Sequence, residues 1–357
     1  MNSPFEDDIN YQIDTIDLGK VRDLFLYNDT LFVSTENEGI YIYKTNSENN
    51  SNSILLSNGN YLEELYQSRD WGIGKDIKSI YYSNSHQILF ALDYNNNTYL
   101  GYTEFLLNDI EDFDNLIQNS CGPDANARKF FINTSNINPE IYVLYKCFDS
   151  SSQCVENPYS NVSSTIFTPF FGDLYTEFQT FGDFSTASVC GTYTIDDLYP
   201  NTNDMYFNSD KFFIANPSEG SNSFGVYNMQ GELLDEYLTE SVVRSVYSIN
   251  DYILAGTEDG CYITLLDGDS IYELGNSKLV IADNFTIYDI FYSDNKLILS
   301  CGSDGVLIYD WDGTSSEFYE DIRLFPSDAY YGTKVRVLDN IYFIGTEDGL
   351  EIFNIEE

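Results

Sequence analysis

Positive charge is scarce in this sequence. Its 357 residues include 16 lysines and arginines against 58 aspartates and glutamates, which gives a formal net charge of −42. A chain with this charge is repelled by phosphate groups, so we expect neither nucleic acids nor anionic membranes as partners. The charge favours a cation, a basic protein or a cationic polymer, while solubility in salt is the simpler interpretation of the same charge.

Long apolar segments and common catalytic motifs are also missing. No stretch of 18 apolar residues occurs, and the first residues lack the basic and apolar parts of a signal peptide, so we expect no membrane insertion. The chain contains no glycine-rich phosphate loop, no Cys-x-x-Cys and no Gly-x-Ser-x-Gly. These absences argue against a nucleotide, a zinc or iron–sulfur centre and a serine nucleophile. We therefore expect no enzyme, no catalytic residue and no bound cofactor.

Apolar and aromatic residues are plentiful. Hydrophobic residues make up 43% of the chain and aromatic residues 16%, with 31 tyrosines and 25 phenylalanines. This content is sufficient for a packed core, and aromatic side chains favour strands. The composition therefore indicates a folded, strand-rich protein.

One pattern recurs three times near the C-terminus, at a spacing of about 44 residues. Each copy has an entry strand, a second apolar strand, an acidic turn ending in glycine, and a third strand. A repeat of this length built from short strands is typical of the blade of a β-propeller. The three copies occupy residues 243–263, 287–309 and 334–353.

Four further units precede these copies, so we predict seven blades. The first unit, at 21–43, matches closely, whereas the third, at 129–145, is degraded. Residues 11–18 alternate apolar and polar side chains, and they could supply the fourth strand that the last copy lacks. The sequence thus predicts an all-β propeller of seven four-stranded blades, closed by an N-terminal strand.

The domain organisation follows from the same pattern. Residues 1–10 form an acidic tail and residues 11–357 a single propeller domain. Between about 103 and 200 the period is lost and four of the six cysteines occur. We interpret this region as a loop-rich insert that is stapled by disulfides.

Two segments carry a resemblance to a known family. Residues 305–310 read Gly-Val-Leu-Ile-Tyr-Asp and residues 39–43 read Gly-Ile-Tyr-Ile-Tyr. This pattern resembles the LVIVD-type repeats of β-propellers over about two-thirds of the chain, and the likeness fades across 103–200. The resemblance implies a secreted or cell-surface protein without shared catalytic residues. The period is also similar to that of WD repeats, but their Gly-His and Trp-Asp marks are absent.

The cysteines are interpreted as disulfides, because their number is even and no Cys-x-x-Cys occurs. We expect Cys147 to pair with Cys154 and Cys121 with Cys190. Cys261 and Cys301 lie on adjacent blades and either bridge them or are buried free thiols.

Acidic turns recur at equivalent places in the copies, so their carboxylates should lie on one rim of the propeller. Such a rim could bind Ca²⁺ or a basic partner, although acidic residues before glycine are also simply good turn formers. The candidate calcium ligands are Glu258, Asp259, Asp304, Glu347 and Asp348.

Two further sets of residues bear on function. The first is six Asn-x-Ser/Thr sequons, which favour an extracellular or cell-surface glycoprotein: Asn28, Asn49, Asn96, Asn133, Asn161 and Asn284. The second is a group of aromatic residues in the insert that could contact a partner or stack on sugars: Phe167, Phe170, Phe171, Tyr175 and Phe178.

These features predict a non-enzymatic scaffold or self-assembling structural subunit. Its rigid acidic ring would display the loops of the insert to a protein partner or to further copies. A Ca²⁺-assisted glycan-binding module is the alternative, and a carboxylate-dependent hydrolase is a third hypothesis.

Overall fold

The structure is a computed structural model of the whole chain. It describes residues 11–47, 53–67, 76–85, 88–93, 98–102, 116–119, 125–133, 140–147, 160–166, 193–198, 202, 204–208, 210–217, 222–274, 278–330 and 332–355. Of the residues 46–47, 88, 92–93, 98–102, 116–119, 125–133, 140–147, 160–166, 193–198 and 320–321, it describes the backbone alone.

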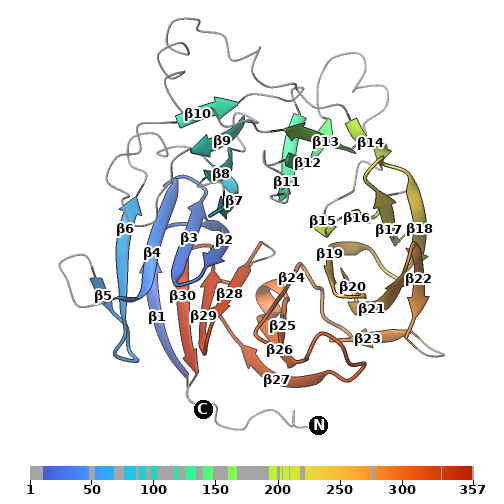
Figure 1. Cartoon of the computed structure of the whole chain (residues 1–357). Helices are drawn as coiled ribbons and strands as arrows, with labels where there is room; N and C mark the ends of the chain where they lie inside the picture. The colour runs from blue at the N-terminus through green and yellow to red at the C-terminus, as the bar shows by residue number, and fades with distance from the viewer. Residues whose placement is uncertain are drawn as a thin grey trace, which may run out of the picture.

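Seven antiparallel sheets, built from the described residues, surround one axis (Figure 1). The innermost strands of blades 1 to 7 are β2 (Val21–Tyr27), β7 (Ile77–Ser83), β11 (Ala125–Asn133), β15 (Met205–Asn208), β19 (Val243–Ile249), β24 (Asp289–Ser293) and β28 (Lys334–Leu338). The second strands are β3 (Thr30–Thr35), β8 (Ile88–Asp93), β12 (Glu140–Cys147), β16 (Lys211–Ala215), β20 (Tyr252–Thr257), β25 (Lys296–Ser300) and β29 (Ile341–Gly345).

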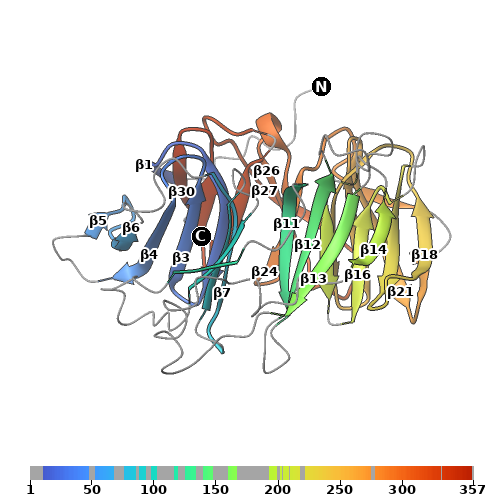
Figure 2. The same cartoon turned by 90° about the horizontal axis from the view of Figure 1, so that it is seen from above.

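The outer halves of the blades follow the same order. The third strands are β4 (Ile40–Ser47), β9 (Thr98–Tyr102), β13 (Ser160–Ile166), β17 (Ser223–Asn228), β21 (Gly260–Asp267), β26 (Val306–Asp310) and β30 (Gly349–Ile355). The fourth strands are β6 (Tyr61–Gln67), β10 (Leu116–Asn119), β14 (Tyr193–Leu198), β18 (Leu233–Leu238), β22 (Ser270–Glu273), β27 (Tyr319–Leu324) and β1 (Tyr11–Asp17). Figure 2 shows the ring from its edge.

The predicted closure by an N-terminal strand is confirmed. β1 pairs antiparallel with β30 over its whole length, from Tyr11 opposite Ile355 to Asp17 opposite Gly349. The backbone of Val21 then donates to the carbonyl of Thr346 at 3.0 Å. Blade 7 is therefore assembled from both ends of the described chain, and this removes a free sheet edge.

Two blades differ from the expected four strands. Blade 1 adds β5 (Ser53–Leu55), which pairs with β6, and blade 5 adds β23 (Leu279–Ile281), which pairs with β21. β5 lies inside the segment 44–60, which is rich in asparagine and serine. The segment 103–200 contains β10 of blade 2 and all four strands of blade 3.

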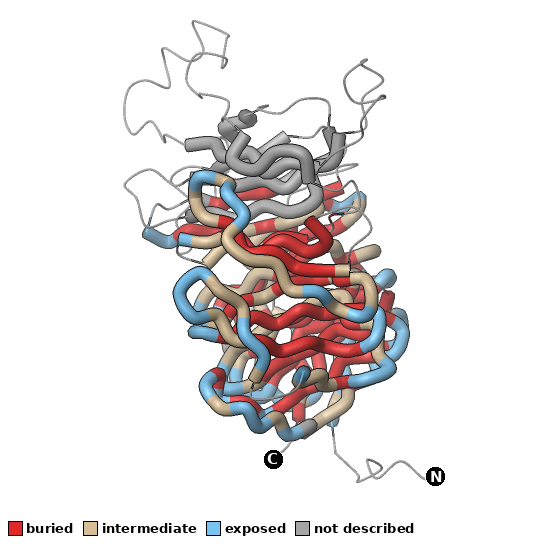
Figure 3. The backbone as a smooth tube through the Cα atoms, turned by 90° about the vertical axis from the view of Figure 1, so that its right-hand side faces the viewer, coloured by how far each residue is buried: buried red, intermediate tan, exposed pale blue. Residues whose placement is uncertain are grey.

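The core consists of apolar layers between neighbouring blades. Every residue of β3 and of β20 is buried, whereas the outer strand β18 is half-buried and exposed. One layer joins blade 1 to blade 7 through Leu24, Val33 and Phe343. Figure 3 shows this distribution, with buried strands inside and exposed turns outside. Because successive side chains of a strand point to opposite faces, a strand between two blades must be apolar on both.

Tight turns join the strands where the sequence places glycine. Gly231, Gly268 and Gly313 all have positive φ, which suits the hairpin turns between the third and fourth strands of their blades. Gly305 also has positive φ. In addition, a Cβ at this position would lie 2.3 Å from the carbonyl oxygen of Leu324, which excludes a side chain. A 3₁₀ turn, η2 (Gly302–Asp304), precedes that glycine. Within the described ranges no helix has the length and apolar character that a bilayer span requires.

Candidate functional site

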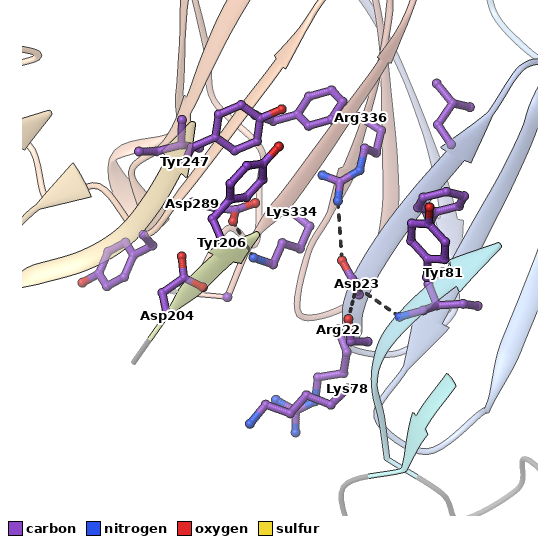
Figure 4. A pocket seen from close by; sticks show the side chains of 18 of the residues that line it. Arg22, Asp23, Lys78, Tyr81, Asp204, Tyr206, Tyr247, Asp289, Lys334 and Arg336 are labelled. Carbon is purple, nitrogen blue, oxygen red and sulfur yellow. Dashed lines mark hydrogen bonds and ion pairs between the residues drawn. The ribbon is translucent and has the colours of Figure 1, made fainter. Parts of the chain in front are cut away.

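A cavity of about 450 Å³ lies at the propeller axis. The described inner strands β2, β7, β15, β19, β24 and β28 all contribute to its wall. Figure 4 shows their side chains converging from both sides of the opening. A volume of this size is typical of a pocket for a small molecule or a short segment of a partner.

Basic residues are concentrated in the lining of this cavity. Five of the 16 basic residues line it, together with three aspartates, so its lining side chains sum to +2 (five minus three) in a chain of −42. The basic residues are Arg22, Lys78, Arg244, Lys334 and Arg336.

Three of these cations share one position in their blades. The pairing of the inner strand with its neighbour shifts between Val21 and Asp23, between Ile77 and Ser79, and between Val243 and Ser245. The residues that have no partner on the second strand at these shifts are Arg22, Lys78 and Arg244. In β11 the same kind of shift occurs at Arg128. A bulge of this kind re-aims a side chain away from the ladder.

Carboxylates bind Arg22 and Arg244 at these bulges. Arg22 donates from Nε and Nη2 to both oxygens of Asp76 at 2.8 Å, and from Nη2 to Glu36 at 2.7 Å. Burial lowers the pKa of Arg22, but Asp76 and Glu36 raise it by more, so its pKa lies above the ordinary value. Arg244 pairs likewise with Glu258, while its Nε is buried without a hydrogen-bond partner.

At the next position along the chain, aspartates of blades 1 and 4 bind the blade that follows. Asp23 accepts from Ser79 Oγ at 2.7 Å and from the backbone N–H of Ile80 at 3.2 Å. Asp204 accepts from the backbone N–H of Val246 at 2.9 Å. These carboxylates therefore satisfy buried donors of a neighbouring sheet.

The inner strand of blade 7, β28, contributes two cations to the cavity. Lys334 Nζ donates to Asp289 at 2.7 Å, and Arg336 Nη2 lies 3.7 Å from Asp23. Burial lowers the pKa of Lys334, but the carboxylates of Asp289, Asp23 and Asp204 raise it by more. Its pKa therefore lies above the ordinary value, and the lysine is charged at neutral pH.

Aromatic rings form the third element of the cavity. Phe25 and Tyr81 have their ring centroids 4.8 Å apart, and those of Tyr206 and Tyr247 are 4.5 Å apart. The guanidinium of Arg336 lies 4.5 Å from the centroid of Phe291. Burial raises the pKa values of Tyr206 and Tyr247, so both rings stay neutral. The cavity thus combines positive charge with flat apolar surfaces.

The acidic turns predicted as calcium ligands occupy equivalent hairpins, as expected. Glu258 and Asp259 lie between β20 and β21, Asp304 lies in η2, and Glu347 and Asp348 lie between β29 and β30. Glu258 binds Arg244, and Glu347 binds Lys20 at 2.7 Å. Among the residues that the structure describes, no group of three histidine, cysteine or acidic side chains could hold a metal. Calcium binding stays a prediction.

Cys261 and Cys301 are free and buried, so the predicted bridge between their blades is wrong and the alternative of buried thiols is confirmed. Both pack in one apolar layer with Trp311. Burial, followed by the neighbouring Cys301, raises the pKa of Cys261. The predicted pairs of Cys147 with Cys154 and of Cys121 with Cys190 involve side chains outside the described part of the chain.

The predicted sequon asparagines and aromatic residues lie partly inside and partly outside the described part of the chain. Asn28 and Asn284 lie in exposed turns, while Asn133 and Asn161 lie on the backbone of β11 and β13. Glycosylation of these asparagines stays a prediction. Outside the described residues lie Asn49, Asn96, Phe167, Phe170, Phe171, Tyr175 and Phe178.

Comparison with known proteins gives the fold but no family. No family model and no curated protein matches the sequence, so the resemblance to LVIVD-type repeats stays a prediction.

Several solved structures are similar over almost the whole chain. The CNH domain of AfRom2 has a TM-score of 0.59 at 10% identity and covers 98% of this chain and 99% of its own. The WD40 β-propeller domain of Doa1 has a TM-score of 0.58 at 13% identity, covering 97% and 98%. YCF48 bound to a D1 peptide has a TM-score of 0.59 at 10% identity, covering 99% and 97%. At these identities the likeness shows the fold alone: the chain is a β-propeller.

Proposed function

We propose that this protein is a non-enzymatic scaffold that binds a partner protein at its axial cavity. The observation that carries the proposal is the concentration of five basic residues and two aromatic pairs at the axis of a chain with a net charge of −42. Loops of the insert would extend the contact, as the sequence suggests. The fold supports this role, since a rigid ring of strands fixes the positions of the groups around its axis.

Binding is favoured over catalysis by the state of the cavity carboxylates. Asp23 accepts hydrogen bonds from a neighbouring blade, and Asp289 accepts from Lys334. An acid–base pair needs carboxylates that can reach a substrate and exchange protons with it. These two are instead occupied in holding blades and cations together.

Site-specific photocrosslinking tests the location of the partner contact. Tyr288 lines the cavity, whereas Tyr272 lies on the outer strand β22 and is 52% exposed. We expect Tyr288→p-benzoylphenylalanine to crosslink a partner in the cells that make the protein, and the matched Tyr272→p-benzoylphenylalanine not to. Crosslinking from position 272 alone would place the partner on the circumference and refute the axial site.

We also propose an extracellular or cell-surface setting, which rests on the six sequons and on the resemblance to LVIVD-type repeats. Two of the sequon asparagines, Asn28 and Asn284, lie in exposed turns where a glycan could be attached. Treatment of the native protein with an N-glycosidase should lower its mass. An unchanged mass would remove the main support for this setting.

A further inference from the structure

The repeated blades provide an internal comparison for each inner-strand residue. A residue type that the fold requires should recur at the same register position, because each blade packs in the same way. At the position of Asp23, opposite the second strand, the seven blades have Asp23, Ser79, Lys129, Asp204, Ser245, Asp289 and Lys334. Two positions further along the same strands they have Phe25, Tyr81, Phe131, Tyr206, Tyr247, Phe291 and Arg336.

Blade 7 thus departs from the pattern twice. Five of the seven blades have an aspartate or serine where β28 has Lys334, and β11 has Lys129 there. Six blades have an aromatic ring where β28 has Arg336. Packing explains the common residues: Asp23 and Asp204 accept from the next blade, and Ser245 Oγ donates to the carbonyl of Ile287 at 3.4 Å. It does not explain why the last blade should have two cations.

The two cations face the same cavity and retain donors for a ligand. Lys334 donates one hydrogen bond, to Asp289, and an ammonium has three donors. Arg336 donates from Nη1 to the carbonyl of Val335 at 2.6 Å and lies 3.7 Å from Asp23, which leaves part of its fork of five donors for another group. Figure 4 shows both side chains directed into the opening.

The surroundings restrict what such a ligand can be. Asp23, Asp204 and Asp289 also line the cavity, so a dianionic phosphate would be repelled more strongly than a single carboxylate. The ring pairs of Phe25 with Tyr81 and of Tyr206 with Tyr247 provide flat apolar surfaces on two sides of the same cavity (Figure 4). An anion attached to a flat apolar group matches both features.

We propose that the axial cavity binds a carboxylate attached to an aromatic group, with Lys334 and Arg336 contacting the carboxylate and the tyrosines contacting the ring. The inference rests on the proposed function, since the partner would supply this group. The source is either the terminal carboxylate of a chain ending in an aromatic residue or an acidic side chain next to one.

Titration calorimetry with small probes tests the inference on the intact protein. The probes are N-acetylphenylalanine for the terminal carboxylate, N-acetyl-aspartyl-phenylalanine amide for the side-chain carboxylate, and N-acetylphenylalanine amide as the neutral control. We expect at least one acid to bind about tenfold or more tightly than the amide, because a charge-assisted hydrogen bond is lost in the amide. Equal binding of both acids and the amide, or of none of them, would overturn the proposal.

Variants that restore the pattern of the other blades separate binding from packing. Arg336→Tyr and Lys334→Ser introduce residue types that other blades have, so we expect thermal midpoints near that of the parent chain. Their affinity for the acid probe should fall by about tenfold or more. Arg323→Tyr, on the outer strand β27, makes the same change outside the cavity and should leave affinity unchanged. Unchanged affinity in Arg336→Tyr and Lys334→Ser would refute the assignment, whatever their stability.

The two proposals fail in different ways. If the carboxylate probes do not bind but Tyr288→p-benzoylphenylalanine still crosslinks a partner, the ligand class is wrong and the axial contact stands. If the probes bind but no partner is crosslinked at position 288, the cavity binds a carboxylate and the partner-binding function is wrong.

Discussion

Asn216 of blade 4 and Val243 of blade 5 exchange two hydrogen bonds. The amide of Asn216 donates from Nδ2 to the carbonyl of Val243 at 2.5 Å and accepts from its backbone N–H at 3.2 Å. Asn216 has a φ of +49°, which asparagine tolerates better than most residues. One side chain therefore satisfies both backbone groups of the residue that begins the next blade.

Replacing this asparagine should weaken the contact between the blades. We expect Asn216→Ala to lower the free energy of unfolding by about 2–3 kcal/mol, because it leaves a buried donor and a buried acceptor without partners. Urea denaturation measures the change. Asn295→Ala is the control, since Asn295 also has a positive φ but is exposed. Equal losses in both variants would show that backbone strain alone is responsible.

Tyr41 and Tyr43 stack in blade 1 but differ in their hydroxyl groups. Tyr41 Oη accepts from Gln67 at 2.7 Å, whereas Tyr43 Oη is buried without a partner. We expect Tyr43→Phe to raise the free energy of unfolding by about 1 kcal/mol and Tyr41→Phe to lower it by about the same amount. Chemical denaturation of both variants checks the signs. A loss of stability in Tyr43→Phe would show that its hydroxyl has an acceptor in solution.

Closure of the ring depends on the inner face of β1. Ile16 packs against the apolar layer between blades 1 and 7, while Ile13 on the same strand is 44% exposed. We expect Ile16→Asp to destabilise the protein by about 2 kcal/mol or more and Ile13→Asp to change its stability by less than about 0.5 kcal/mol. Thermal unfolding distinguishes them. Similar midpoints for both would mean that β1 contributes little to closure.

Buried tyrosines should make the protein sensitive to alkali. Burial raises the pKa values of Tyr43 and Tyr227 above their ordinary value of 10. The folded state therefore keeps protons that the unfolded state loses above pH 10. The associated stability is present below pH 10 and falls as pH rises further, by about 1.4 kcal/mol per pH unit for each tyrosine. Urea denaturation between pH 9 and 11 measures this slope, which Tyr43→Phe should reduce. A slope that Tyr43→Phe leaves unchanged would contradict the assignment.

The two described thiols should resist alkylation until the protein unfolds. Cys261 and Cys301 are buried, and burial raises the pKa of Cys261, so little thiolate is present at neutral pH. We expect iodoacetamide to label the peptides that contain them only after denaturation. Labelling is followed by peptide mass mapping. Rapid labelling of either peptide in the native protein would show that its blade opens readily.

The architecture could be predicted because its signal is repeated. The apolar second strands and glycine turns recur in every regular copy, and the alternation over residues 11–18 predicts a strand there. It does not predict which face is buried, because Tyr11 and Ile13 are exposed whereas Ile16 packs against the core. The short strand β5 could not be found in this way, because Ser53, Ile54 and Leu55 are half-buried or exposed and lie in a polar segment. Edge strands of this kind bury too little to leave a periodic pattern.

The cavity was harder to predict, although several of its residues occupy equivalent positions in the sequence repeats. Arg22, Lys78 and Arg244 follow the first apolar residue of their copies, but a net charge of −42 describes the average surface and hides a local excess of the opposite sign. The acidic turns were predicted as a candidate metal rim because carboxylates such as Glu258 were considered without these arginines. Only the fold brings each carboxylate to its guanidinium.

The pairing of β1 with β30 also determines when the protein can fold. The partners of residues 11–17 are synthesised more than 330 residues later, which takes roughly 20–70 s at typical rates of translation. During this time the early blades can form as they leave the ribosome, but the first strand has no sheet to join. Circular closure must therefore wait until β30 has left the ribosome, and a ribosome that stalls within the last blade would release an open ring with an unprotected edge.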